Sequence, residues 1–157
     1  MILPILITIL GGIFRFTNLN WDAGLRLHPD EALIINGAHA VRFFSHLFPG
    51  FFDYNGFSVY LVRATALAIS WFTNNPYWSQ NVIGMTMVGR FLSALLATLS
   101  IPLVYLLGKS LWNKTVGVLA AFFLACTPLA IQLAHFYTTE SILVFFFAPS
   151  RIMCCFV

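Results

Sequence analysis

Long apolar stretches alternate with a single mixed segment along this chain. Three apolar stretches cover residues 2–19, 86–108 and 115–135, and each contains very few charged side chains. Each approaches or exceeds the roughly 20 residues that a helix needs to cross about 30 Å of hydrocarbon. A further apolar run at 141–157 is interrupted by a proline and an arginine, and it is too short to cross completely. The pattern predicts an all-α integral membrane fold with about three full transmembrane helices plus a partial fourth.

The last residues, APSRIMCCFV, read differently from the sequence before them. Half a span would leave backbone polar groups without partners in lipid. We therefore expect one membrane domain over 1–157 that is truncated or frame-shifted at its end. An authentic short end is the alternative.

The segment 20–84 mixes apolar residues with most of the charges, histidines and turn residues of the chain. It is typical of a large folded loop outside the cytoplasm. Within it, Asp30 to about Leu47 suits an amphipathic helix, and Phe57 to Phe72 is apolar apart from Arg63 and a few hydroxyl groups. Placing that charge mid-bilayer would cost roughly 3 kcal/mol or more, which favours a helix that lies in the interface or is partly re-entrant.

The basic turn KSLWNK lies between the second and third predicted spans, as is typical of the cytoplasmic side. With this turn and the amino terminus inside, the loop 20–84 and the end of the third span both lie outside. The resulting excess of arginines outside opposes a crude positive-inside count, which has little force for a loop of this length.

Composition supports the membrane assignment and narrows the function classes. The chain is 60% hydrophobic and 8% charged, whereas soluble domains carry about 25% charged residues. Its net charge of +3 is dispersed rather than concentrated in a basic block, which argues for loops near anionic headgroups and against nucleic acid. Arg15, near the end of the first stretch, is expected to snorkel to the interface beside Trp21.

The segment LHPDE places His28 and two adjacent carboxylates, Asp30 and Glu31, before a helical pattern. Pro29 biases His28 toward an extended conformation. On local grounds Asp30 is equally well explained as the cap of the helix, with Glu31 in its first turn. A capping role does not exclude catalysis.

The segment HFYTTES places His135 and Glu140 at the far end of the third predicted span. By the same parity it emerges on the side that holds Asp30. Two acidic sites on one membrane face suit transfer to a hydroxyl acceptor, because one carboxylate takes the proton and others position the substrates. Glu140 alone is more simply explained as a span boundary. A divalent metal stays open as an alternative, although no helical H-E-x-x-H spacing and no cysteine partner support one.

Several blocks in order resemble the large membrane glycosyltransferase superfamily, GT-C, that includes protein O-mannosyltransferases and the aminoarabinose transferases of lipid A. NWDAGLRLHPDEA resembles its first extracytoplasmic loop, and FFDYNGFSVYL resembles the interfacial segment that follows. The stretch from GRFLSALLATLS to HFYTTES resembles the next two spans and the second acidic site. Many relatives have Lys-Pro or Tyr-Pro where this chain has Tyr54-Asn55-Gly56, so the phosphate contact there is unassigned.

The resemblance implies transfer of a sugar from a polyprenyl- or dolichyl-phosphate carrier to a protein, lipid or glycan hydroxyl on the non-cytoplasmic face, in a bacterial plasma membrane. Asp30 would be the general base, Glu31 would orient a substrate and Glu140 would support its geometry. The sugar donor is a substrate, and no certain cofactor is implied. Candidate substrate contacts are the basic side chains of Arg90, Arg63, Arg26, His28 and His135.

Two rival functions remain. A transporter or small membrane-assembly subunit would use Arg63, Arg90 and Glu140 as polar groups along a path. A non-catalytic remnant is the other, because family members continue through many more spans that complete the lipid groove.

Overall fold

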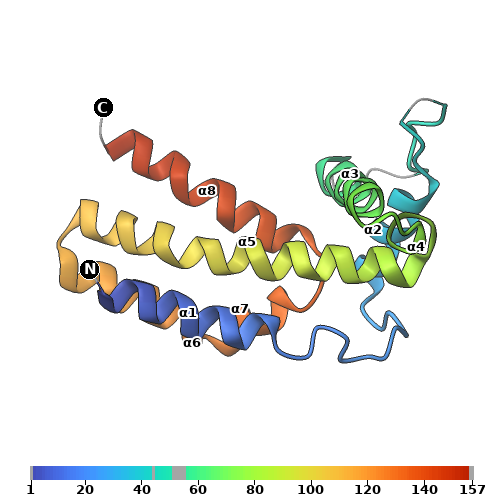
Figure 1. The fold of residues 1–157 in the computed structure, drawn as a ribbon. Helices are drawn as coiled ribbons and strands as arrows, with labels where there is room; N and C mark the ends of the chain where they lie inside the picture. Colours follow the sequence, from blue (N-terminus) through green and yellow to red (C-terminus); the bar gives the residue numbers. More distant parts are fainter. Residues whose placement is uncertain (1, 44, 51–55, 156–157) are drawn as a thin grey trace. The chain divides into compact units, whose positions relative to one another are not determined.

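The regular structure of the described residues is helical, apart from one isolated bridge between Arg42 and His46. A computed structural model describes residues 2–43, 45–50 and 56–155, with side-chain surroundings up to residue 148. The predicted α-helical class is confirmed for these residues. The helices, shown in Figure 1, are α1 (Ile2–Phe16), α2 (Pro29–Ala40), α3 (Gly56–Thr73), α4 (Tyr77–Gln80), α5 (Val82–Leu111), α6 (Lys114–Cys126), α7 (Pro128–Ala134) and α8 (Thr139–Cys155).

The chain divides into two compact units, each described by itself. The helical unit consists of Met1–Thr17, Ser93–His135 and Glu140–Val157. The loop unit consists of Asn18–Leu92 and Phe136–Thr139. Helix α5 therefore contributes residues to both units.

In the helical unit, α1 packs against α6 and α7, which lie beside it in Figure 1. Ile7, Ile101, Ala121 and Ala125 form its buried apolar cluster. The two helices of the α5–α6 hairpin approach closely at Gly117, where an added Cβ would lie 2.6 Å from the carbonyl oxygen of Tyr105. Small residues allow this approach, as in helix pairs within membranes.

The third predicted span, 115–135, is divided into α6 and α7, whose axes differ by 59°. Pro128 has no N–H group, so it cannot donate to the carbonyl oxygen of Leu124 four residues earlier. Arg15 replaces the missing donor. Its Nη2 donates to the Leu124 oxygen at 2.8 Å and its Nη1 to the Ala125 oxygen at 3.0 Å. The prediction that Arg15 snorkels to the interface was wrong, because its side chain is fully buried and bound to these carbonyls.

Helix α5 is the one described helix that is by itself long and apolar enough to cross a membrane. The bent pair α6 and α7 passes the same criteria if it is taken as one span, whereas α1 and Thr139–Ala148 are shorter apolar helices. Helix α5 begins at Val82, earlier than the predicted 86, because the Asn81 side chain accepts hydrogen bonds from the N–H groups of Ile83 and Gly84. The number of spans stays a prediction.

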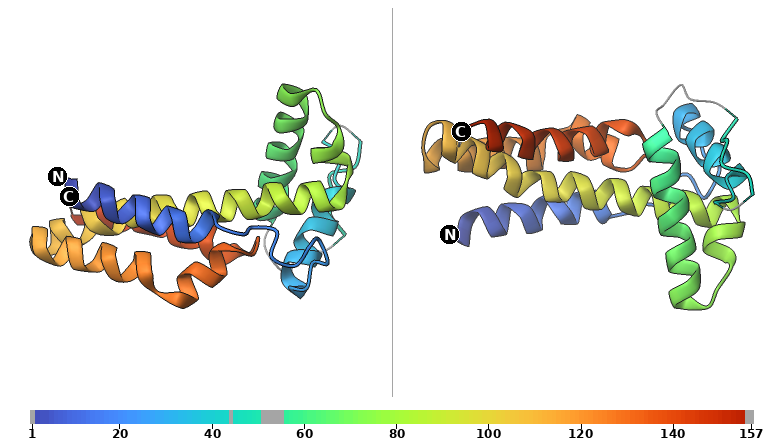
Figure 2. Two further views of the ribbon diagram at one scale, coloured as in Figure 1. Left: turned by 60° about the horizontal axis from the view of Figure 1, so that its bottom comes forward. Right: turned by 90° about the horizontal axis from the view of Figure 1, so that it is seen from above.

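In the loop unit, α2 packs on α3 and α3 packs on α4, which runs next to it in Figure 2. Helix α2 buries Ile34 and Ile35, and α3 buries Val59 and Val62. The predicted helix from Asp30 to Leu47 is too long, because the backbone becomes extended at Val41. The first part of the FFDYNGFSVYL block, with Tyr54 and Asn55, lies outside the described residues.

Candidate functional site

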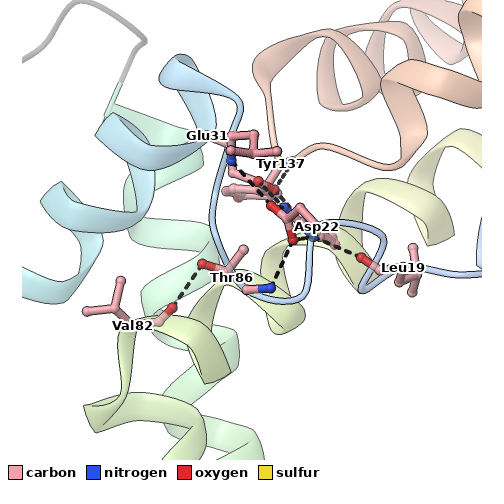
Figure 3. Close-up of polar contacts among 9 residues, drawn as sticks. Leu19, Asp22, Glu31, Val82, Thr86 and Tyr137 are labelled. Carbon is pink, nitrogen blue, oxygen red and sulfur yellow. Dashed lines mark hydrogen bonds and ion pairs between the residues drawn. The ribbon is translucent and has the colours of Figure 1, made fainter.

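Arg90, near the start of α5, binds two carboxylates inside the loop unit. Its Nε and Nη2 donate to Glu31 Oε1 and Oε2 at 2.9 and 2.6 Å, and its Nη1 and Nη2 donate to Asp22 Oδ1 and Oδ2 at 2.8 and 2.7 Å. Figure 3 shows Asp22 and Glu31 directed toward the same point. The side chains of both ion pairs have no solvent exposure. We call Asp22, Glu31 and Arg90 the buried triad.

The guanidinium group of Arg90 has no donor left for another ligand. Its fifth hydrogen bond goes from Nη1 to the carbonyl oxygen of Leu19 at 3.0 Å, and an arginine has five N–H groups in total. The Trp21 ring covers its carbon atom Cζ at 5.4 Å from the ring centroid. In this arrangement Arg90 connects Asp22, Glu31 and Leu19, and it has no N–H group left to bind a carrier phosphate.

Asp22 also shapes the loop before α2. Its carboxylate accepts hydrogen bonds from the backbone N–H groups of Gly24 and Leu27. Within the segment from Asp22 to Leu27, Ala23 and Arg26 take positive φ angles of 52° and 53°, which residues other than glycine rarely adopt. The pKa of the Asp22 carboxyl lies well below its usual range, mainly because Arg90 donates hydrogen bonds to it. The loop conformation therefore depends on an ionised Asp22.

Tyr137 connects the triad to α3. Its backbone N–H donates to Glu31 Oε1 at 2.9 Å, and its hydroxyl donates to the carbonyl oxygen of Ser58 at 2.7 Å. Burial raises the pKa of the Tyr137 hydroxyl, so that group stays protonated and remains a donor. Gly89 of α5 makes room for the ring, since a Cβ there would lie 2.7 Å from Tyr137 Cγ.

Asp30 lies beside the triad, as the second residue of α2. It is half-buried, whereas its neighbour Glu31 is fully buried. The interpretation of Asp30 as the helix cap was wrong. His28 occupies the cap position, with the extended backbone that Pro29 favours, and Pro29 is the first helical residue. Anchoring Glu31 fixes the start of α2 and with it the backbone that carries Asp30.

Two predicted substrate contacts lie near this helix start. The Nδ1 atom of His28 is buried without a hydrogen-bond partner, and the His28 ring stacks on Phe136 at 4.5 Å. Arg26 donates from Nη1 to the Asn36 side chain at 2.8 Å. Both residues belong to the loop unit, which also contains Asp30.

The second acidic segment is divided between the two units. Glu140 and His135 belong to the helical unit, whereas Phe136–Thr139 belong to the loop unit. Glu140 is exposed and lines a cavity of about 80 Å³ together with Arg15 and Ser141. Both ring nitrogens of His135 lie within 2.9 Å of backbone carbonyl oxygens, those of Ile131 and Thr17. The convergence of Glu140 with Asp30 stays a prediction.

Arg63 lies in α3, where its Nη1 donates to the carbonyl oxygen of Ser79 at 2.7 Å.

Among the described residues, no group of three or more His, Cys, Asp or Glu side chains is arranged to hold a metal ion.

Sequence reasoning missed Asp22 and Tyr137. Asp22 lies inside the quoted NWDAGLRLHPDEA block, and its signal was an Asp-Ala-Gly turn within a loop of a membrane protein. Tyr137 gave no comparable signal, because its role comes from its backbone N–H and from a contact with α3.

Comparison with known proteins gives one match. Residues 81–156 match the model of the family described as dolichyl-phosphate-mannose-protein mannosyltransferase. No curated protein and no solved structure matches the chain. The matched stretch includes Arg90, His135 and Glu140 and leaves out Asp22, Asp30 and Glu31. The resemblance to membrane glycosyltransferases is therefore confirmed over residues 81–156, the stretch that matches the dolichyl-phosphate-mannose-protein mannosyltransferase family.

Proposed function

We propose that the chain takes part in transfer of a sugar from a polyprenyl- or dolichyl-phosphate carrier to an acceptor hydroxyl on the non-cytoplasmic face of a membrane. The family match over residues 81–156 supports this class of reaction. The observation that ties it to a site is the buried triad, which anchors the start of α2 beside Asp30.

In the proposed step, the Asp30 carboxylate takes the proton from the acceptor hydroxyl. The acceptor oxygen then forms a bond to the sugar's anomeric carbon, and the bond from that carbon to the carrier phosphate breaks. Glu31 acts as a positioning residue, because both its oxygens are already bound by Arg90 and Tyr137. Glu140 belongs to the helical unit, and its support of substrate geometry stays a prediction.

Basic groups near the loop surface would stabilise the carrier phosphate as it leaves. Arg26 and Arg63 are our candidates for that contact, in place of Arg90, whose donors are all bound within the protein. His28 and His135 are further candidate contacts to substrate. A divalent metal stays the alternative source of that positive charge, since a phosphate leaving group needs positive charge but little protonation.

The proposed topology has three full spans and a partial fourth, formed by α1, α5, the pair α6 and α7, and α8. Helices α2 and α3 then lie at the outer surface, facing the periplasm or the exterior of a bacterial cell. Within the loop unit Arg90 is neutralised by two internal carboxylates, which argues against the rival in which it lines a transport path.

Transfer of labelled mannose from a polyprenyl-phosphate mannose in membranes that contain the full chain tests the reaction. We expect Asp30→Asn to lower the rate by roughly 10²–10⁴-fold, the usual contribution of a general base. Lys114→Gln, a charge change at the exposed start of α6, should leave the rate unchanged. A wild-type rate for Asp30→Asn would rule out the proposed base.

Cysteine accessibility tests the topology, using Asp30→Cys, Glu140→Cys and Lys109→Cys in a chain without its own cysteines. An impermeant thiol reagent should label the first two from outside and the third only after permeabilisation. If positions 30 and 140 are labelled from opposite sides, the proposed mechanism fails.

A further inference from the structure

The loop unit contains a hollow surrounded by basic side chains. It has a volume of about 360 Å³ and is lined by His39, Arg42, Arg63, Ser79 and Gln80. Small-molecule sites in proteins usually measure about 300–1,000 Å³. We call this cavity the basic hollow.

Two of its side chains are fixed by hydrogen bonds to neighbouring carbonyl groups. Arg63 Nη1 lies 2.7 Å from the carbonyl oxygen of Ser79, and His39 Nε2 lies 2.9 Å from that of Gln80. These contacts connect α2 and α3 to the end of α4. The walls of the basic hollow are therefore connected by hydrogen bonds within the loop unit, and Arg63 and His39 are held in place by them.

Within the part of the chain that the structure describes, no carboxylate forms an ion pair with the arginines of the basic hollow. The Arg63 Nε is buried and has no hydrogen-bond partner. The ion pairs found among the described residues are those of Arg90, so neither Arg42 nor Arg63 has a carboxylate partner there. Burial lowers the pKa of Arg63, and the nearby charge of Arg42 lowers it further. A buried donor without a partner is destabilising, and an acceptor bound at Arg63 would relieve that loss.

We propose that the basic hollow binds a phosphate group, carried by a lipid headgroup or free in solution. Guanidinium groups bind phosphate oxygens through paired N–H donors, and a phosphate has enough oxygens to serve two arginines together. Arg63 offers its Nε and remaining N–H groups, and Arg42 offers a guanidinium that makes no hydrogen bond to a described residue. A single carboxylate would leave one of the two arginines without a charged partner.

This inference deepens the proposed function, in that the carrier phosphate of a sugar donor is one occupant of the basic hollow. Binding itself needs neither a sugar nor an acceptor. It is therefore measurable even if no transfer takes place.

Microscale thermophoresis of the full chain in a neutral detergent tests the proposal. The titrants are a short-chain phosphatidic acid, the matching diacylglycerol that lacks phosphate, and inorganic phosphate. We expect saturable binding of the phosphatidic acid and none of the diacylglycerol. If the natural source is a lipid headgroup, inorganic phosphate binds at least tenfold more weakly than phosphatidic acid. If the source is free phosphate, the two bind alike.

Three variants locate the binding site. Arg42→Gln and Arg63→Gln should each raise the Kd for phosphatidic acid at least tenfold, whereas Lys114→Gln, which removes the same charge elsewhere, should leave it unchanged. Arg42→Gln is decisive, because it breaks no hydrogen bond to a described residue and so is expected to leave the fold intact. An unchanged Kd for Arg42→Gln, or equal binding of diacylglycerol, overturns the proposal.

Failure of this proposal is distinguishable from failure of the proposed transfer. Asp30→Asn should bind phosphatidic acid like the wild type while losing transfer. Loss of transfer in Arg42→Gln with unchanged phosphate binding would instead count against the basic hollow as the phosphate site.

Discussion

Glu31 and Arg90 are 59 positions apart in the sequence and meet through two hydrogen bonds of 2.9 and 2.6 Å, with neither side chain exposed to solvent. A buried pair of this kind gains from its attraction but loses the hydration of both charges. The pair therefore matters less for net stability than for the positions of the residues around it. Here it connects the first helix of the loop unit to α5, and Asp30 is the neighbour of the anchored carboxylate.

Removing one member of the buried triad should cost much more than removing a surface charge. Arg90→Gln leaves two carboxylates buried without a charged partner, so we expect the free energy of unfolding to fall by about 3–5 kcal/mol. Arg90→Lys should recover only part of this loss, because three donors cannot replace five. Denaturant unfolding of the purified protein in detergent, followed by tryptophan fluorescence, measures the loss.

Arg26→Gln is the matched control, because that arginine makes one hydrogen bond at the surface of the same unit. We expect it to cost less than about 1 kcal/mol. Equal losses for the two arginine variants would mean that the buried triad contributes no special stability.

Because Asp22 is ionised in the folded state, the free energy of unfolding should depend on pH. Its pKa is lower in the folded state than the value near 3.9 of an unfolded chain, so the folded state binds fewer protons. The stabilisation is complete above about pH 5 and is lost as the pH falls toward the depressed folded value. The free energy of unfolding of the wild type should therefore fall more steeply below pH 5 than that of Asp22→Asn. Parallel curves would show that Asp22 does not titrate in the way its contacts require.

Gly89 should be intolerant of a side chain. An added Cβ lies 2.7 Å from Tyr137 Cγ, so Gly89→Ala has to displace the ring or bend α5, at a cost of about 1–3 kcal/mol. Gly12→Ala is the matched helical control, since its nearest contact, Thr98 Cγ2, is 3.3 Å away and alanine favours a helix. Thermal unfolding of both variants in one detergent measures the difference. Similar melting temperatures for the two would contradict the close packing of Tyr137.

Local patterns in the sequence predicted the helices and their approximate ends. The apolar stretches became helices, because apolar residues at this density favour a backbone whose polar groups are satisfied internally. The extended conformation of His28 followed from the proline after it, a local steric effect. The early start of α5 also has a local cause, the Asn81 side chain, because Asn is a strongly preferred residue before a helix.

The candidate site was predictable only in part, because its partners come together through tertiary packing. Asp30 and Glu31 could be selected from a short motif, but Arg90 meets Asp22 across 68 positions of chain. The sequence showed an arginine and several carboxylates without showing which of them are neutralised by one another. The sequence alone therefore suggests a phosphate contact at Arg90, although the fold uses all five of its donors.

The break between α6 and α7 leads to the last prediction. Arg15 donates to the carbonyl oxygens of Leu124 and Ala125, which the break at Pro128 deprives of helical partners. Arg15→Leu should therefore destabilise the helical unit by about 1–3 kcal/mol for each carbonyl left unsatisfied. Pro128→Ala supplies the N–H that the Leu124 oxygen lacks, so Arg15→Leu should cost less in that background. A double-mutant cycle measured by thermal unfolding gives the coupling energy. A coupling near zero would mean that Arg15 stabilises the unit through other contacts, since the repaired helix would then be no less dependent on it.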